Sequence, residues 1–192
     1  MLHKIISAAT LVAIAIAVMA SPCLAKQPIR TIGGTVTKVS DGDTLQVTDD
    51  QGTKVKIRLY GADAPETAKP NKPGQPGGEE SFQALRSKVA GKYIQVQIMD
   101  IDQYKRAVGI VWVGNRPINL EMVADGWAWA YRQYLDRPYS SEFIKAEETA
   151  RRAGKGIWRQ GGNVQPPWEF RKQLKNGGQI GRQASFLEQI LQ

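Results

Sequence analysis

Short runs of alternating apolar and polar residues constrain the fold of this chain more than any other feature. Between Lys54 and Tyr60, valine, isoleucine and leucine occupy positions 55, 57 and 59, and bulky polar residues occupy the positions between them. A period of two is typical of a β-strand with one buried face. Two shorter candidates, Thr35–Val39 and Thr44–Thr48, precede this run and are separated by the turn Asp41-Gly42-Asp43. The three runs together predict a β-meander.

The remaining apolar spacing predicts helices and two more strands. After a loop rich in proline and glycine, the expected elements are, in order, a helix at Glu79–Val89, strands at Tyr93–Met99 and Ala107–Val113, a short helix to Asp125 that Asn119 would cap, and a helix at Ser140–Ala153. A helix between the third and fourth of five strands is the order of the OB-fold. We therefore expect a mainly β (α+β) domain, a five-stranded OB-fold barrel with about three helices.

The first 25 residues are typical of a secretory signal peptide. Lys4 gives a basic start, Ile5–Met19 carries no charge, and Ala20–Ala25 supplies small residues for cleavage. A membrane anchor is the alternative, but a spanning helix needs about 20 apolar residues, and this run is shorter. Lipidation of Cys23 is a minor alternative, because the residue before it is proline. We expect a secreted or periplasmic protein without stable membrane insertion after cleavage.

Cleavage of residues 1–25 would leave a chain without cysteine or histidine, because the only ones are Cys23 and His3. This excludes disulfides, a Cys/His zinc site, a thiol nucleophile and a histidine-based triad in the mature chain. A bound metal must then have oxygen ligands, which favours Ca²⁺ or Mg²⁺. A general base must be an aspartate, glutamate, lysine or tyrosine.

The mature chain is expected to form one domain over 26–161 and a basic C-terminal extension over 162–192. The extension is expected to be a surface-docked tail or a partly ordered segment. The net charge of +8 suits a polyanionic partner, although basicity alone is weak support. Lys69 and Lys72 are expected to be solvated surface charges that add to this attraction. We infer no protein partner and expect a monomer.

Acids and arginines are predicted to meet at one rim of the barrel. Arg58 lies on the polar face of the third strand, Asp63 and Glu66 follow just past its end, and Asp43 comes from a neighbouring turn. Each stretch alone reads as an ordinary turn or loop. Together they place carboxylates beside a phosphate-binding arginine, where the carboxylates would repel a phosphate unless a cation neutralised them.

A hard divalent cation resolves this conflict. Asp43 and Asp63 would hold it, the backbone carbonyl of Ala64 would add a ligand, and a phosphate oxygen would complete the shell. Glu66 would then accept a proton from the attacking water. Two arginines, Arg58 and Arg106, would clamp the phosphate and stabilise the charge of the transition state. This arrangement predicts hydrolysis of nucleic-acid phosphodiesters.

Three motifs carry a resemblance to a known family. Asp-Gly-Asp-Thr at 41–44, Arg-Leu-x-Gly-x-Asp-x-Pro-Glu at 58–66 and Asp-x-Tyr-x-Arg at 102–106 resemble the staphylococcal nuclease (thermonuclease) family. The resemblance covers about Ile32–Trp158 and includes the run Gly-Lys-Gly-Ile-Trp at its end. It implies an OB-fold and Ca²⁺-dependent endonucleolytic cleavage of DNA and RNA that leaves 3′-phosphate ends.

The resemblance also implies roles for individual residues. The implied roles are calcium ligands for Asp43, Asp63 and the Ala64 carbonyl, a nearby acid for Asp41, phosphate binding for Arg58 and Arg106, the general base for Glu66, and nucleotide contacts for Tyr104 and Tyr131. The aromatic run Trp127–Tyr131 has two interpretations, because bases can stack on such side chains whereas most buried aromatics pack in the core.

Two other functions remain open at this stage. A non-catalytic OB-fold module would bind nucleic acid through charge and stacking, but loss of an acid or arginine would then be expected. A basic envelope protein would bind anionic surfaces through its tail, but this leaves the acids without a purpose.

Overall fold

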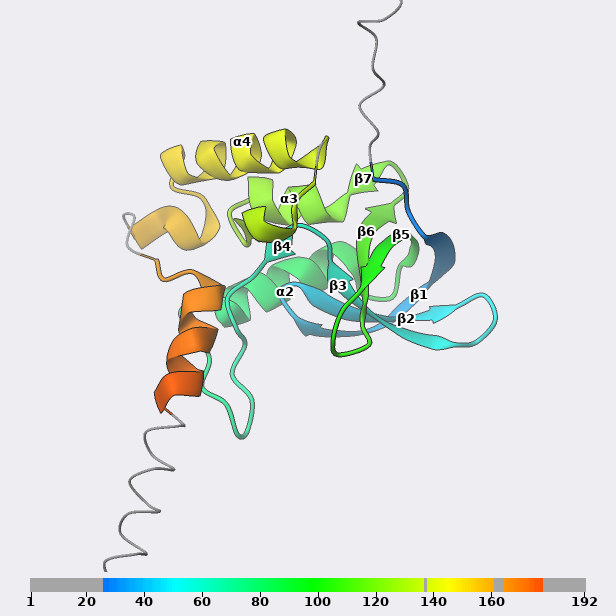
Figure 1. The fold of residues 1–192 in the computed structure, drawn as a ribbon, viewed down its shortest axis with the longest axis horizontal. Coiled ribbons are helices and arrows are strands. Elements are labelled where there is room, and N and C mark those ends of the chain that lie inside the picture. Colours follow the sequence, from blue (N-terminus) through cyan, green and yellow to red (C-terminus); the bar gives the residue numbers. More distant parts are fainter. Residues whose placement is uncertain (1–25, 137, 161–163, 178–192) are drawn as a thin grey trace, which may run out of the picture.

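Five strands close into a barrel in the computed structural model, which describes residues 26–136, 138–160 and 164–177 (Figure 1). The strands are β1 (Arg30–Asp41), β2 (Thr44–Asp49), β3 (Lys54–Leu59), β5 (Tyr93–Ile101) and β6 (Ala107–Val113). They pair antiparallel in the order β3-β2-β1-β5-β6, and a parallel pairing of β3 with β6 closes the cylinder. The predicted OB-fold barrel is therefore confirmed, whereas the predicted signal peptide lies outside the described residues.

The predicted alternation sets the inner face of the barrel. Ile57 and Leu59 are buried almost completely, and so are Leu45 and Val47 of the neighbouring strand. Val55 is only partly buried but packs against the same core. Burial of these alternate positions removes apolar surface from water, which is the main stabilising contribution to such a core.

The first strand extends further than its sequence pattern predicts. β1 begins at Arg30 rather than at Thr35, and Gly33 and Gly34 both pair with β5. Glycine has a low strand propensity, so the sequence pattern stops short of these residues. A side chain at Gly34 would clash with the backbone of Thr48 in β2, so the close approach of the two paired strands requires glycine there.

Three predicted helices pack outside the barrel. The helices are α2 (Gly78–Val89), α3 (Ile118–Ala124) and α4 (Tyr139–Arg152), and all three confirm the sequence pattern within two residues. Figure 1 shows α4 lying over α3, and α2, which lies between β4 and β5 in the sequence, packs against β1. The helices in the part of the chain that the structure describes are too short or too polar to span a bilayer.

Several short elements escaped prediction because their patterns are too short to read. They are β4 (Ala62–Asp63), β7 (Arg116–Pro117), β8 (Trp129–Ala130) and two 3₁₀ turns, η1 (Arg132–Tyr134) and η2 (Gly156–Gln160). β4 and β8 pair antiparallel in a sheet of their own. A further helical segment, 167–177, is drawn in orange in Figure 1 and lies beside the loop that follows β4.

Asn119 does not cap the short helix, so that prediction is wrong. The helix starts one residue earlier, after Pro117, and the Asn119 side chain is fully buried. Its amide donates to the carbonyls of Tyr60 and Gly109 at 2.9 Å each, and its oxygen accepts from the Val111 amide at 2.8 Å. The side chain therefore joins α3 to Tyr60, just past the end of β3, and to the middle of β6, where the barrel closes.

Replacing Asn119 with alanine should destabilise the fold by roughly 3 kcal/mol, because it leaves buried backbone groups without partners. Urea unfolding followed by circular dichroism measures this. The matched control is Asn115→Ala in the exposed turn after β6, which should unfold like the wild type. Equal midpoints for the two variants would contradict the role of Asn119.

Candidate active site

The guanidinium of Arg58 joins two acids from different elements. Asp43 lies in the turn between β1 and β2, where the next residue, Thr44, pairs with Arg58 across the strands. Asp63 comes from β4, just past the end of β3. The Nη2 atom of Arg58 lies 3.0 Å from Asp43 Oδ2 and also contacts Asp63 Oδ1. The structure thus brings together three of the side chains that the sequence placed at the rim.

The two carboxylates differ in proton affinity, because burial outweighs the neighbouring cations at Asp63 but not at Asp43. The Asp63 side chain is fully buried, and this raises its pKa to about 6 although Arg171 and Arg58 act in the opposite direction. Burial also acts to raise the pKa of Asp43, but the charge of Arg58 and a 2.8 Å hydrogen bond from Thr44 outweigh it, so the pKa is lowered. Two buried carboxylates this close need positive charge to remain ionised together.

The donors at this point fit a hard cation. One nitrogen of Arg58 touches an oxygen of each acid, so Asp43 and Asp63 can reach a common centre. Ala64, whose carbonyl is the third predicted ligand, follows directly and is buried. Within the described ranges no three acids, histidines or cysteines form a complete metal cage. Water and substrate oxygens would therefore have to fill the remaining positions.

Glu66 is paired through both of its carboxylate oxygens. The ammonium of Lys72 contacts Oε2, and Nη1 of Arg171 donates to Oε1 at 3.0 Å. Burial acts to raise the pKa of Glu66, but these two hydrogen bonds lower it below the ordinary value. The carboxylate is therefore ionised at neutral pH, which is the form that accepts a proton.

Arg171 is a residue of this site that the sequence did not reveal. From segment 167–177 its Nη2 reaches Asp63 Oδ2 at 2.7 Å and its Nη1 reaches Asp63 Oδ1 at 3.1 Å. This is the two-pronged geometry in which arginine binds a carboxylate most strongly. Pro166 and Pro167 before Trp168 are a helix-start signal that would have predicted the helix, but nothing local predicts where it docks.

A second acid of the β1–β2 turn fixes the loop after β4. Asp41 Oδ1 accepts from the amide and hydroxyl of Thr67 at 3.0 and 2.6 Å, and Oδ2 pairs with Lys69 at 3.0 Å. The prediction that Lys69 and Lys72 are simply solvated surface charges is therefore wrong. Both are partly exposed, but each pairs with an acid of the site because the loop folds back over the turn.

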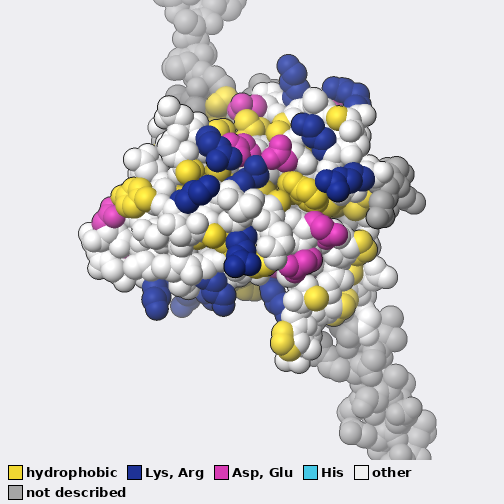
Figure 2. Space-filling view, turned by 180° about the vertical axis from the view of Figure 1, so that it is seen from behind, with side chains coloured by type: hydrophobic (Ala, Val, Ile, Leu, Met, Phe, Trp, Pro, Cys, Tyr) yellow, Lys and Arg dark blue, Asp and Glu magenta, His cyan; other side chains and the backbone are white. Residues whose placement is uncertain are grey.

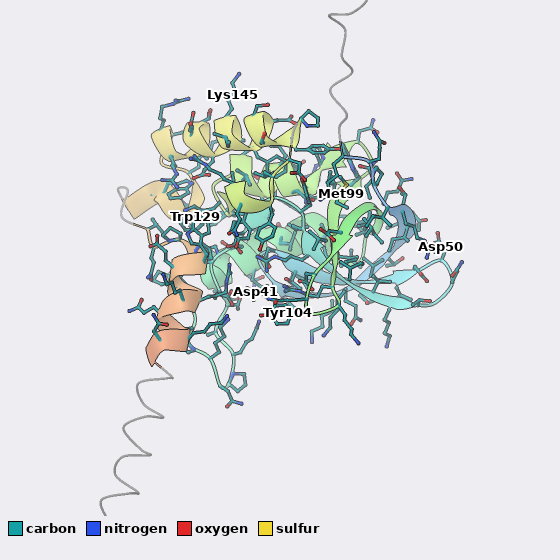
Figure 3. The ribbon with its side chains drawn as sticks, viewed as in Figure 1. Asp41, Asp50, Met99, Tyr104, Trp129 and Lys145 are labelled. Carbon is teal, nitrogen blue, oxygen red and sulfur yellow. The ribbon has the colours of Figure 1, made fainter. Side chains whose placement is uncertain are left out.

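Arg106 lies beside this group of ion pairs without joining it. Its Nε donates to Asp102 at 2.7 Å, and its guanidinium carbon lies 5.3 Å from the centre of the Tyr104 ring. Its charge still helps to lower the pKa of Asp43, so it lies within electrostatic reach. Tyr104 is 65% exposed on the β5–β6 turn, at the lower edge of the barrel in Figure 3.

The other predicted substrate residue, Tyr131, borders the site but is covered. Its amide donates to the Gly61 carbonyl at 2.8 Å, which places it next to β4. Burial raises its pKa, and the charge of Asp63 acts in the same direction. The Trp168 ring stacks on it with centres 5.5 Å apart and planes within 8°. Trp129 is buried and packs edge-on against Trp158, so core packing accounts for this aromatic.

Comparison with known proteins decides the family. Residues 56–160 match the family model described as staphylococcal nuclease homologue. The chain belongs to this family. The predicted resemblance is therefore confirmed, and the matched range contains β3, β4 and the Arg106 turn but not Arg171.

Individual relatives differ in how much of their length they share with this chain. An uncharacterized endonuclease of Haemophilus influenzae is 35% identical over 140 residues, 73% of each chain. A micrococcal nuclease of Shigella flexneri is 34% identical over 152 residues, 74% of this chain and 82% of that protein. A probable staphylococcal-like nuclease of rice, CAN2, is 35% identical over 137 residues, and this chain covers only 34% of its length.

Replacing Asp41 with alanine removes the acceptor for Thr67 and Lys69 and should therefore release the loop 67–78. The barrel should remain folded. Hydrogen–deuterium exchange of peptides from this loop should rise at least tenfold. Asp50→Ala is the control, since Asp50 is exposed at the opposite end of the barrel in Figure 3. Unchanged exchange in the Asp41 variant would show that other contacts hold the loop.

Proposed function

We propose that this chain is an exported, Ca²⁺-dependent endonuclease that hydrolyses phosphodiester bonds of DNA and/or RNA and leaves 3′-phosphate ends. The observation that carries the proposal is the contact of one Arg58 nitrogen with both Asp43 and Asp63, with Glu66 three residues further on. Membership of a nuclease family and relatives named as nucleases support the same reaction. Export rests on the pattern of residues 1–25.

The roles follow from the positions of the side chains. Asp43, Asp63 and the Ala64 carbonyl would hold the calcium ion, which supplies Lewis acidity at a phosphate oxygen. Glu66 accepts a proton from the water whose oxygen attacks phosphorus. Arg58 stabilises the negative charge of the five-coordinate transition state, and Arg106 approaches it from the neighbouring turn. The bond between phosphorus and the 5′ oxygen breaks, and that oxygen takes up a proton.

The surface supports binding of a polyanion. Figure 2 shows lysine and arginine side chains spread over the face seen from behind, with fewer acidic ones among them. The net charge is +8. Such a surface attracts phosphates without reading sequence, and the attraction weakens as salt screens it. Tyr104, exposed beside Arg106, offers a ring on which a base can stack. We further propose that the protein acts as a monomer.

Removing divalent metal should abolish cleavage by the purified full-length mature chain. Plasmid digestion in CaCl₂ should stop when a chelator is added and resume with excess Ca²⁺. A series with Mg²⁺, Mn²⁺ and Zn²⁺ identifies the preferred ion, and end-labelling identifies the phosphate position. Full cleavage in chelator would rule out the metal-dependent mechanism, and binding without cleavage under every metal would leave a non-catalytic module.

The glutamate assigned as base gives a sharper test. Glu66→Gln keeps the size of the side chain but cannot accept the proton, so kcat should fall roughly 10²–10⁴-fold. Glu80→Gln, on the exposed face of α2, removes the same charge and should retain wild-type kcat. Thermal unfolding of both variants controls for folding. Near-full activity of the Glu66 variant would remove its assigned role.

A further inference from the structure

The C-terminal helical segment places a positive charge on the acids assigned to metal binding and proton transfer. The guanidinium of Arg171 binds both oxygens of Asp63 and one oxygen of Glu66. Lys72 takes the other oxygen of Glu66, and Arg58 adds a further contact to Asp63. With these contacts in place, Asp63 has no exposed side-chain surface and Glu66 has 12%. Asp63 is therefore closed to a metal ion and to water, and both oxygens of Glu66 are already occupied by cations.

The segment is docked by more than this one arginine. Trp168, one helical turn before Arg171, stacks on Tyr131 at the border of the site. Pro167 is buried, and the side-chain amide of Gln75, in the loop after β4, donates to the Gln165 carbonyl. The contacts involve three parts of the rim, namely β4, the loop after it and the residue following β8. Docking of this segment is thus specific to the face that carries the acids.

Charges in the docked arrangement balance without a metal ion. The acids are Asp41, Asp43, Asp63 and Glu66, and the cations paired with them are Arg58, Lys69, Lys72 and Arg171. In this set the charges of the four acids are already neutralised. The four resident cations would therefore repel an added divalent cation. One resident cation must therefore leave for an ion to bind well.

Arg171 is the cation whose departure requires the least rearrangement. Arg58 belongs to β3 and is fixed by pairing with β2 and β6. Lys69 and Lys72 belong to a loop that is tied to the barrel through Asp41. Arg171 instead belongs to a segment that lies outside the family-matched range and packs on the rim from outside the barrel. Moving that segment leaves the barrel and its hydrogen bonds intact.

We propose that segment 167–177 is an intramolecular cap, in which Arg171 occupies the cation position of the site and Ca²⁺ binding requires the cap to leave. The inference rests on the proposed metal-dependent nuclease function and adds regulation to it. The docked form is inactive because Asp63 and Glu66 are occupied. Calcium displaces Arg171, frees Glu66 to accept a proton, and exposes the face of Tyr131 that Trp168 covers. Calcium affinity therefore includes the free energy of undocking the cap.

Calcium titration of the full-length mature protein tests the cap directly. Isothermal titration calorimetry with CaCl₂, without nucleic acid, should show at least tenfold tighter binding to Arg171→Gln than to the wild type. Lys172→Gln is the matched control, because it removes one positive charge from the next, exposed position of the same helix and should change Kd less than twofold. Trp168→Ala should also tighten binding, since it weakens docking without touching a carboxylate.

The release of segment 167–177 from the rim can be measured separately from calcium binding. Hydrogen–deuterium exchange of peptides covering 167–177 should rise in the wild type when Ca²⁺ is added, while peptides from β1 and β5 remain protected. In Arg171→Gln the same peptides should exchange rapidly with or without Ca²⁺. Thermal unfolding in chelator checks that the Arg171, Lys172 and Trp168 variants retain the fold. Unchanged exchange of 167–177 on saturation with Ca²⁺ would overturn the cap.

Failure of the cap and failure of the nuclease assignment give different results. If the wild type cleaves DNA only with Ca²⁺ but Arg171→Gln binds Ca²⁺ no more tightly, the cap is wrong and the nuclease stands. Weaker Ca²⁺ binding by that variant overturns the cap in the same way and makes Arg171 a binding residue. If the wild type cleaves equally in chelator, the metal-dependent function fails and the cap fails with it.

Discussion

Two carboxylates buried side by side cannot both keep their charge unless positive groups replace the lost water. Asp43 and Asp63 impose this constraint on the rim of the barrel, and much of the local structure follows from it. Arg58 projects from β3 into the gap between them. Arg171 supplies a second cation from a segment more than a hundred residues away in the chain. The site is thus a set of charges held by one another, in which any change of one partner alters the rest.

Closure of the barrel fixes the positions of these charged side chains. The parallel pairing of β3 with β6 fixes the end of β3, and Asn119 ties that end to α3 through buried hydrogen bonds. The chain then turns into β4, whose pairing with β8 orients Asp63 inward. A carboxylate on a free loop would move away from its neighbour to lower the repulsion. A carboxylate on a paired strand cannot, and this rigidity favours a site that binds a cation.

Local patterns predicted most of the fold and the convergence of Arg58 with Asp43 and Asp63, for identifiable reasons. Alternation at 55, 57 and 59 fixed the buried face of β3, and the side of the strand that carries Arg58 followed from it. The motif acids lie within a few residues of strand ends, so their convergence follows from the barrel. Failures occurred where tertiary contacts outweigh local signals. The glycines in β1 made the predicted strand start too late. Asn119 stands at a helix start in the sequence, but its buried side chain hydrogen-bonds to the barrel strands instead of capping the helix. Arg171 could not be predicted, because only docking brings it to Asp63.

The pairing of β4 with β8 sets the order in which the barrel and the acid site can form as the chain is synthesised. All five barrel strands are complete in sequence by Val113, but the strand that holds Asp63 in place is not made until Trp129–Ala130. The guanidinium that covers the same acid follows only at position 171. A chain emerging from its N-terminus therefore acquires first the barrel, then a formed acid pair, and last the arginine that seals it. The contact between Asp63 and Arg171 can form only after the chain has been made through position 171.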